Sequence, residues 1–204
     1  MRRNIIFFLI VFLPVAGNSQ NPDIRLLRSI YSPEPLNSDG FFRFTSNSEV
    51  YVAAGIPVGL AITGLIRDDR DMLRNAIVMV AGEALNEGLK FGLKYSINRE
   101  RPFETYPDIV RKISAGGPSF PSGHTSSAFE TATSISLAYP EWYVIVPSYA
   151  WAGTVAYSRM HLGVHYPSDV LAGAVIGAGS AYLTYKINQK LNIKKRPKPC
   201  NCPK

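Results

Sequence analysis

Long apolar runs separated by short polar stretches dominate the hydropathy pattern of this chain. A shorter helix is expected near residues 24–30, followed by a loop as far as residue 44, because Pro33, Pro35 and Gly40 interrupt that stretch. No alternating strand pattern and no internal repeat occurs in the sequence, so the pattern predicts a single all-α bundle. The longer apolar runs predict five helices, at residues 50–66, 72–95, 125–137, 142–157 and 169–187.

The helix expected at residues 72–95 carries charges on one face. Glu83, Glu87, Lys90 and Lys94 follow one another at helical spacing. Such a stripe is a solvated face with ion pairs between neighbouring turns, or it is the polar lining of an active site. The pattern alone leaves both interpretations open.

The helix expected at residues 169–187 is rich in small residues, which allow a neighbouring helix to approach closely. These residues are Ala172, Gly173, Ala174, Gly177, Ala178 and Gly179.

The two ends of the chain differ from the helical part. Arg2 and Arg3 precede an apolar run at residues 5–15 and small residues up to Gln20, a pattern typical of an export signal that is cleaved near Ser19. An uncleaved membrane anchor is the alternative, although the run is short for a span. We assign residues 1–19 to this signal or anchor, 20–192 to the helical domain and 193–204 to a polar basic tail.

The two cysteines and the net charge limit the kinds of ligand and partner that the chain is expected to bind. Cys200 and Cys202 both lie in the tail, where they provide neither a disulfide framework nor a metal site. The formal net charge is +7, but the cations are dispersed or lie in motifs and in the tail. A phosphorylated substrate and an anionic membrane surface therefore explain the charge better than a nucleic acid does.

Residues 116–125, Gly-Gly-Pro-Ser-Phe-Pro-Ser-Gly-His-Thr, can form an anion cradle. The glycines and prolines disfavour a helix before Ser122, and the run that starts at Thr125 favours one. Free backbone N–H groups at a helix N-terminus attract anions, and Gly123 lets the backbone come close to one. Ordinary helix capping by Ser122 is the alternative interpretation.

Two flanking stretches add cations, histidines and a carboxylate to this cradle. Lys94 and Arg101-Pro102 lie upstream, and Ser158-Arg159, His165 and Asp169 lie downstream. The order K-x6-R-P, P-S-G-H and S-R-x5-H-x3-D resembles the type 2 phosphatidic acid phosphatases, which share their site with class A acid phosphatases and vanadium haloperoxidases. The resemblance spans residues 94–169 and implies a helical bundle with the three motifs gathered at one end, within a phosphatidic acid phosphatase type 2 domain.

The resemblance also assigns roles to these residues. It implies that His165 is the nucleophile, that Asp169 orients its ring, and that His124 protonates the leaving oxygen and then activates water. Asp169 acting only as a helix cap is the alternative for that residue. No metal and no cofactor is expected. His161 remains a pocket-lining residue without an assigned role. The expected phosphate-binding residues are Lys94, Arg101, Ser122, Gly123 and Arg159.

The charge pattern also bears on membrane topology. If the chain starts outside and each of the five long helices crosses the membrane, all three motifs face outward, and Arg67, Arg70 and Arg74 face inward with the basic tail. We therefore expect an inner-membrane protein with a site that faces the periplasm. A soluble periplasmic bundle is the alternative, because the mean hydropathy is only +0.01 and the helix at residues 125–137 is short and contains Glu130.

The expected activity is hydrolysis of a phosphomonoester or diphosphate, carried by a lipid or by a small phosphoester. The motifs do not distinguish a phosphatidate from a polyprenyl diphosphate or a phosphorylated lipid headgroup. A phosphotransferase and a soluble acid phosphatase are alternatives. A vanadate-dependent haloperoxidase ranks lower because the chain is short, and a non-catalytic binding protein because the motifs are complete. No nucleic acid partner is expected, and the oligomeric state stays open.

Overall fold

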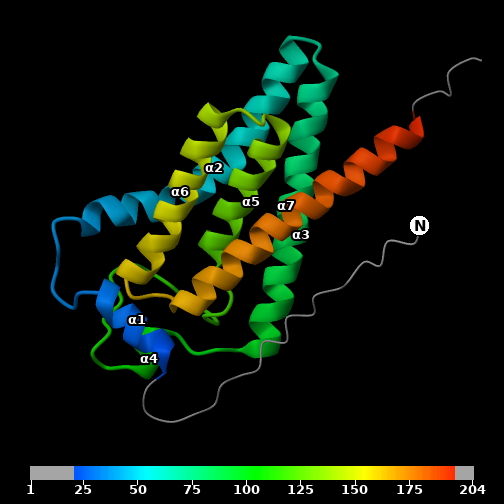
Figure 1. The fold of residues 1–204 in the computed structure, drawn as a ribbon. Helices are drawn as coiled ribbons and strands as arrows, with labels where there is room; N and C mark the ends of the chain where they lie inside the picture. The colour runs from blue at the N-terminus through cyan, green and yellow to red at the C-terminus, as the bar shows by residue number, and fades with distance from the viewer. Residues whose placement is uncertain (1–20, 196–204) are drawn as a thin grey trace, which may run out of the picture.

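A computed structural model describes residues 21–195, and within this range the chain is helical and contains no strand. The all-α prediction is therefore confirmed. The predicted signal or anchor at residues 1–19, and Cys200 and Cys202 in the tail, lie outside the described residues. The helices are α1 (Pro22–Ile30), α2 (Asp39–Ile66), α3 (Arg70–Ile97), α4 (Pro102–Thr105), α5 (Gly123–Ala138), α6 (Trp142–His161) and α7 (Pro167–Lys195) (Figure 1).

Local capping explains several of the helix boundaries. Before α1, the side chain of Asn21 accepts a hydrogen bond from the backbone N–H of Asp23, and Pro22 occupies the first helical position. At the start of α3, the side chain of Asp69 accepts hydrogen bonds from the backbone N–H groups of Asp71 and Met72. That helix ends at Asn98, whose φ of 47° is the left-handed conformation that stops a helix.

The start of α2 differs from the sequence-based expectation. The loop predicted as far as residue 44 is wrong, because α2 already begins at Asp39. Asp39, Ser46 and Glu49 recur at helical spacing and all three side chains are buried, so the polar face of this segment points inward. A search for an apolar inward face misses such a helix. The four-residue α4, which begins at Pro102, was not predicted either.

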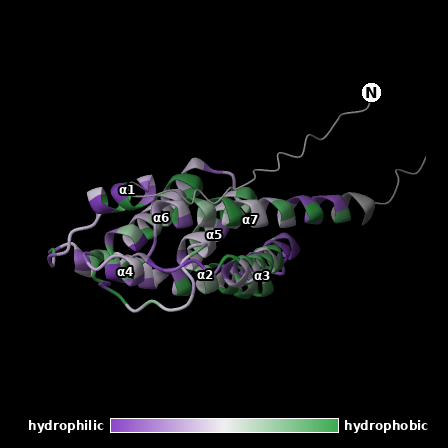
Figure 2. Cartoon of the chain, turned by 90° about the horizontal axis from the view of Figure 1, so that it is seen from below, coloured by the Kyte–Doolittle hydropathy of each residue, from purple (hydrophilic) through white to green (hydrophobic). Residues whose placement is uncertain are grey.

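The bundle has a small and polar interior and an apolar exterior. Ala128, Ala132 and Ala152 form a buried cluster around α5 and α6, where many serine and threonine side chains are also buried. By contrast, Leu65, Ile77 and Trp142 are more than two thirds exposed. Figure 2 shows green hydrophobic residues along α3 and α7. An apolar exterior of this kind is suited to contact with lipid.

Helix α5 lies at the centre of the bundle and packs against α2, α3, α6 and α7. Its contact with α7 depends on two of the small residues. A Cβ atom on Gly173 would lie 2.7 Å from the backbone oxygen of Ser122, and one on Gly177 would overlap the backbone oxygen of Ser126. The sequence-based prediction of close packing by α7 is therefore borne out at these two glycines.

The three motif stretches meet at one end of the bundle, as predicted. The segment between α3 and α5, the start of α5, and the turn between α6 and α7 lie at the end where α1 and α4 cover the bundle (Figure 1). The turn between α2 and α3 lies at the opposite end. A backbone hydrogen bond of 3.0 Å from Ser122 N to Asp169 O ties the starts of α5 and α7 together.

Candidate active site

His165 lies in the turn between α6 and α7, at the centre of the gathered motifs, and is 1% exposed. Its Nδ1 is 3.5 Å from Asp169 Oδ2 and 3.5 Å from Ser119 Oγ. Its other nitrogen, Nε2, is 3.2 Å from Nη1 of Arg101. Because a guanidinium can only donate, Nε2 must accept, and the ring proton therefore resides on Nδ1 toward the carboxylate.

Electrostatics favour the same neutral ring. Burial lowers the pKa of His165 to about 4, and the positive charges of Arg159 and Arg101 add to this effect against the opposing influence of Asp169. At neutral pH the imidazole therefore carries no charge, and the Nε2 lone pair faces the cations.

Arg101 is held rigidly by the surrounding backbone. Its guanidinium donates to the carbonyl oxygens of Gly117, Gly116 and Val164, each at 2.9 Å. These carbonyls belong to the other two motif stretches, so this single side chain connects all three. A guanidinium fixed in this way presents its charge at Nε2 of His165 without having to reorganise.

Hydrogen bonds from neighbouring residues hold Asp169 in place. Its carboxylate accepts hydrogen bonds from Ser119 Oγ (2.5 Å), Arg99 Nη1 (2.7 Å) and the backbone N–H of Tyr166 (3.0 Å). Arg99 also pairs with Asp23 of α1 at 2.7 Å, and its guanidinium stacks 3.9 Å from the ring centroid of Tyr166. Helix α1 is thereby attached to the site.

Sequence reasoning missed three of these supporting residues, Arg99, Ser119 and Asp23. Arg99 and Ser119 lie within the motif stretches, and their polar side chains next to assigned residues were a usable signal. Asp23 belongs to α1 and lies 146 positions before Asp169, and no spacing rule connects it with the motifs.

The start of α5 has the form expected of an anion cradle. Gly123 is the first residue of the helix and His124 the second. The Ser122 side chain bonds to Thr125 Oγ1 at 2.9 Å rather than capping a backbone N–H. The first-turn N–H groups therefore keep their capacity to donate to a ligand. Across the site, Glu49 Oε2 lies 4.0 Å from Nε2 of His124.

Arg159 and Lys94 complete the set of predicted residues. Arg159 is 2% exposed and its Nη1 donates to Ser46 of α2, but its buried Nε has no hydrogen-bond partner among residues 21–195. Lys94 Nζ lies 3.3 Å from the carbonyl oxygen of Pro118 and feels the charges of Arg101 and Arg159. A buried guanidinium N–H without an acceptor can donate a hydrogen bond to an anionic ligand.

The charged stripe on α3 lines the interior on one side. Lys90 is buried and contacts Glu87 and Glu83, so the interpretation as an entirely solvated face is wrong for this part of the stripe.

His161 bonds to Asp39 Oδ1 at 2.8 Å, and Asp39 also pairs with Lys112. This triad fixes the start of α2 against the end of α6.

The curated proteins that this chain resembles include lipid phosphatases. The chain is 35% identical over 97 residues to the lipid A 4'-phosphatase of Bacteroides thetaiotaomicron, an alignment that covers 48% of this chain and 43% of that protein. The chain thus spans less than half of that relative. It is 28% identical to the undecaprenyl-diphosphatase of Sulfolobus acidocaldarius, over 94% of this chain and 92% of the relative.

Solved structures share the fold. The structure of LpxE from Aquifex aeolicus superposes with a TM-score of 0.72 at 26% identity, covering 81% of this chain and 96% of the other. A transmembrane PAP2-type phosphatidylglycerolphosphate phosphatase from Bacillus subtilis superposes with a TM-score of 0.63 at 22% identity, covering 84% and 87%. The all-helical bundle is confirmed by this shared fold. Helices α2 and α7 are long and apolar enough to span a bilayer.

A family model described as the PAP2 superfamily matches residues 75–193, which include all three motif stretches but not Asp23. This match covers more than half of the chain, and it includes Arg101, Ser119 and Asp169, the residues that contact the nitrogens of His165. The chain therefore belongs to the PAP2 superfamily.

Proposed function

We propose that this protein is a metal-independent lipid phosphatase of the inner membrane that works through a phosphohistidine on His165 and faces the periplasm. One observation carries the proposal. Nε2 of a buried neutral histidine faces Arg101, while Nδ1 faces the carboxylate of Asp169. This arrangement places a nitrogen nucleophile next to the fixed positive charge of Arg101, which suits phosphoryl transfer.

The first step transfers the phosphoryl group to the enzyme. The lone pair of His165 Nε2 attacks phosphorus, an N–P bond forms and the P–O bond to the leaving group breaks. His124 gives a proton to the leaving oxygen, so the alcohol departs neutral. Asp169 stabilises the positive charge that develops on the ring of His165 through Nδ1–H. The charge on the transferring group is spread over its oxygens, where Arg101, Arg159 and Lys94 bind.

The second step frees the enzyme. His124, now neutral, takes a proton from a water molecule, the water oxygen attacks phosphorus and the N–P bond breaks. Inorganic phosphate leaves, and His165 returns to its starting state. Because the nucleophile is a neutral nitrogen and fixed cations neutralise the oxygens, neither step calls for a metal ion.

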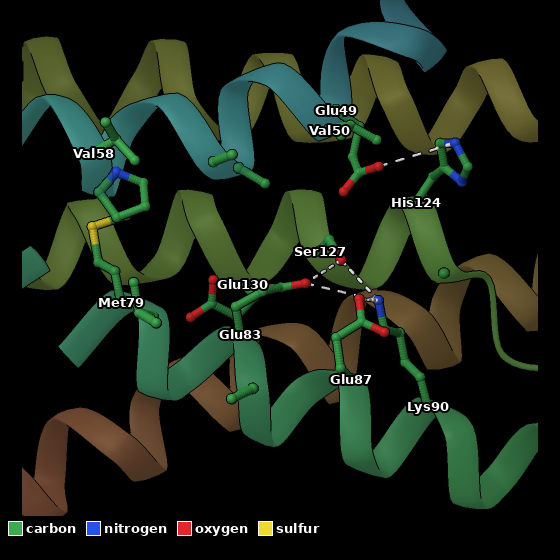
Figure 3. Close-up of a pocket in the computed structure, with 16 residues that line it drawn as sticks. Glu49, Val50, Val58, Met79, Glu83, Glu87, Lys90, His124, Ser127 and Glu130 are labelled. Atoms are coloured by element: carbon green, nitrogen blue, oxygen red, sulfur yellow. Dashed lines mark hydrogen bonds and ion pairs between the residues drawn. The ribbon is translucent and has the colours of Figure 1, made fainter. Parts of the chain in front are cut away.

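The location of the site supports a lipid substrate. The candidate groups lie at one end of a bundle whose outer surface is apolar, and a groove leads from His124 along that surface (Figure 3). The relatives named above are phosphatases of lipid A and of undecaprenyl diphosphate. A phosphorylated lipid in the bilayer can reach such a site without leaving the membrane.

The proposal is tested by phosphate release from purified protein in detergent with EDTA, using phosphatidic acid and a soluble phosphomonoester as substrates. We expect EDTA-resistant release from the lipid and a loss of at least about 1000-fold in kcat for His165→Asn. An acid-labile phosphoryl adduct should form on the wild type and be absent from the variant.

Circular dichroism and the melting temperature show whether His165→Asn is folded. Equal activity of the folded variant and the wild type contradicts the mechanism. Phosphate transfer to an added alcohol in place of water instead identifies a phosphotransferase.

A further inference from the structure

A groove of about 670 Å³ lies beside His124, between α2, α3 and α5 (Figure 3). Gly123 and His124 form one end of it. Val50, Val58 and Val80 on its rim are more than half exposed, so the groove opens toward the side of the bundle. Its size is in the range of pockets that take small molecules.

The walls of the groove are acidic. Four carboxylates line it, on Glu49, Glu83, Glu87 and Glu130. Figure 3 shows Glu83, Glu130 and Ser127 gathered between α3 and α5, with Glu49 across from them on α2. Among the groove-lining residues that the structure describes, Lys90 alone is a lysine or arginine.

The charge of Lys90 is already taken up by protein groups. Its Nζ bonds to Glu87 and, at 2.8 Å, to Ser127 Oγ, and it lies 3.8 Å from Glu83 Oε1. Glu130 is 1% exposed and accepts from Ser134 Oγ at 2.7 Å. Whether the remaining carboxylates are ionised or protonated, the groove holds no free cation to bind a second anionic group.

In the proposed reaction the leaving group lies next to His124, at one end of this groove. In that mechanism, on which this inference rests, His124 protonates the leaving oxygen, so the rest of the substrate extends from His124 into the adjoining groove. A phosphomonoester releases a neutral alcohol. A diphosphate that is attacked at its terminal phosphorus releases a lipid phosphate, which carries negative charge.

We propose that this groove selects lipid phosphomonoesters with an uncharged leaving alcohol over lipid diphosphates, and that Glu83 and Glu87 are specificity-determining residues. Carboxylates repel an anionic leaving group, by roughly threefold to tenfold in rate for a close pair that solvent partly screens. The same carboxylates accept hydrogen bonds from the hydroxyl groups of a sugar or glycerol. The two carboxylates also form ion pairs with Lys90, the cation that could otherwise bind a second phosphate.

Farnesyl phosphate and farnesyl diphosphate provide a matched pair of probes. They share one hydrocarbon chain, and only the charge of the leaving group differs. We would measure kcat/KM for both substrates with wild type, Glu83→Gln, Glu87→Gln, the double variant and Glu141→Gln. Glu141 is an exposed carboxylate outside the groove and serves as the control for removal of a charge.

We expect the ratio of diphosphate to monophosphate kcat/KM to rise at least about tenfold in the double variant and to stay constant in Glu141→Gln. Glu87, whose side chain is 62% exposed, can be changed without disturbing the core, and Glu87→Gln alone should raise the ratio about threefold. An unchanged ratio in the folded Glu87→Gln and double variants overturns the selectivity.

Failure of the proposed function has a different signature. In that case folded wild-type protein releases no phosphate from either farnesyl substrate or from phosphatidic acid. That result contradicts both the proposed phosphatase activity and the proposed selectivity. An active enzyme whose ratio of kcat/KM values does not change contradicts the selectivity alone.

Discussion

At the scale of single residues, the site is organised around the two nitrogens of His165. Asp169 fixes one and Arg101 fixes the other, and both partners are held by further groups. Arg101 is anchored by backbone carbonyls and Asp169 by Arg99 and Ser119. The imidazole is therefore constrained to one tautomer, which lowers the reorganisation needed in the proposed reaction.

The lowered pKa of His165 predicts how stability depends on pH. The unfolded chain binds a proton on this ring below about pH 6.5, whereas the folded protein does so only near pH 4. Over that window the unfolded state binds more protons, so stability falls as the pH falls. Relative to His165→Asn, we expect the wild type to lose about 3 kcal/mol between pH 6.5 and 4.

Chemical unfolding of both proteins in detergent, at a series of pH values, measures this difference. Ionisable groups that do not contact His165 contribute equally to the stability of both chains, so their contributions to the difference cancel. Parallel stability curves for the two proteins would show that His165 titrates at its ordinary pKa in the folded state.

At the scale of helices, the contact between α5 and α7 positions the cradle relative to His165 and Asp169. Gly177 lets the two helices approach until their backbones are in contact. Gly177→Ala places a Cβ against the backbone oxygen of Ser126, and backbone cannot move aside as a flexible side chain can. We expect a loss of about 1–3 kcal/mol in stability and a clear fall in kcat.

Gly179→Ala is the matched control, because it lies on the same helix and its added Cβ meets no atom within 4 Å. Thermal unfolding and phosphate release are measured for both variants. Equal behaviour of Gly177→Ala and Gly179→Ala would mean that the close approach of α5 and α7 has no part in positioning the site.

At the scale of the whole molecule, the distribution of charge bears on orientation in the membrane. The candidate site and the turn between α2 and α3 lie at opposite ends of the bundle (Figure 1). Arg67, Arg70 and Arg74 surround that turn, and positive residues of this kind favour the cytoplasmic side. The proposed orientation therefore puts the site end on the periplasmic side.

Labelling of single cysteines checks this orientation in cells, after Cys200 and Cys202 have been replaced by serine. We expect a membrane-impermeant maleimide to label Glu100→Cys, at the site end, once the outer membrane has been permeabilised. Arg67→Cys, in the turn between α2 and α3, should react only after lysis. The reverse pattern of labelling would place the site on the cytoplasmic side.

The sequence by itself determined the fold class, and it predicted the residues that gather in the candidate site. Apolar runs separated by turn residues dictate helices, and the three motif stretches contain the groups that surround His165, because catalytic chemistry restricts residue type and local spacing. The start of α2 escaped detection because its buried face is polar, opposite to the usual pattern.

Only the tertiary structure decided which distant residues support the site. Asp23 reaches Arg99, Ser46 reaches Arg159, and Glu49 faces His124, each across a large separation in sequence. It also decided that Lys90 lies inside the bundle, between α3 and α5. Spacing along a helix shows which residues share a face, but the packing of the helices determines what that face meets.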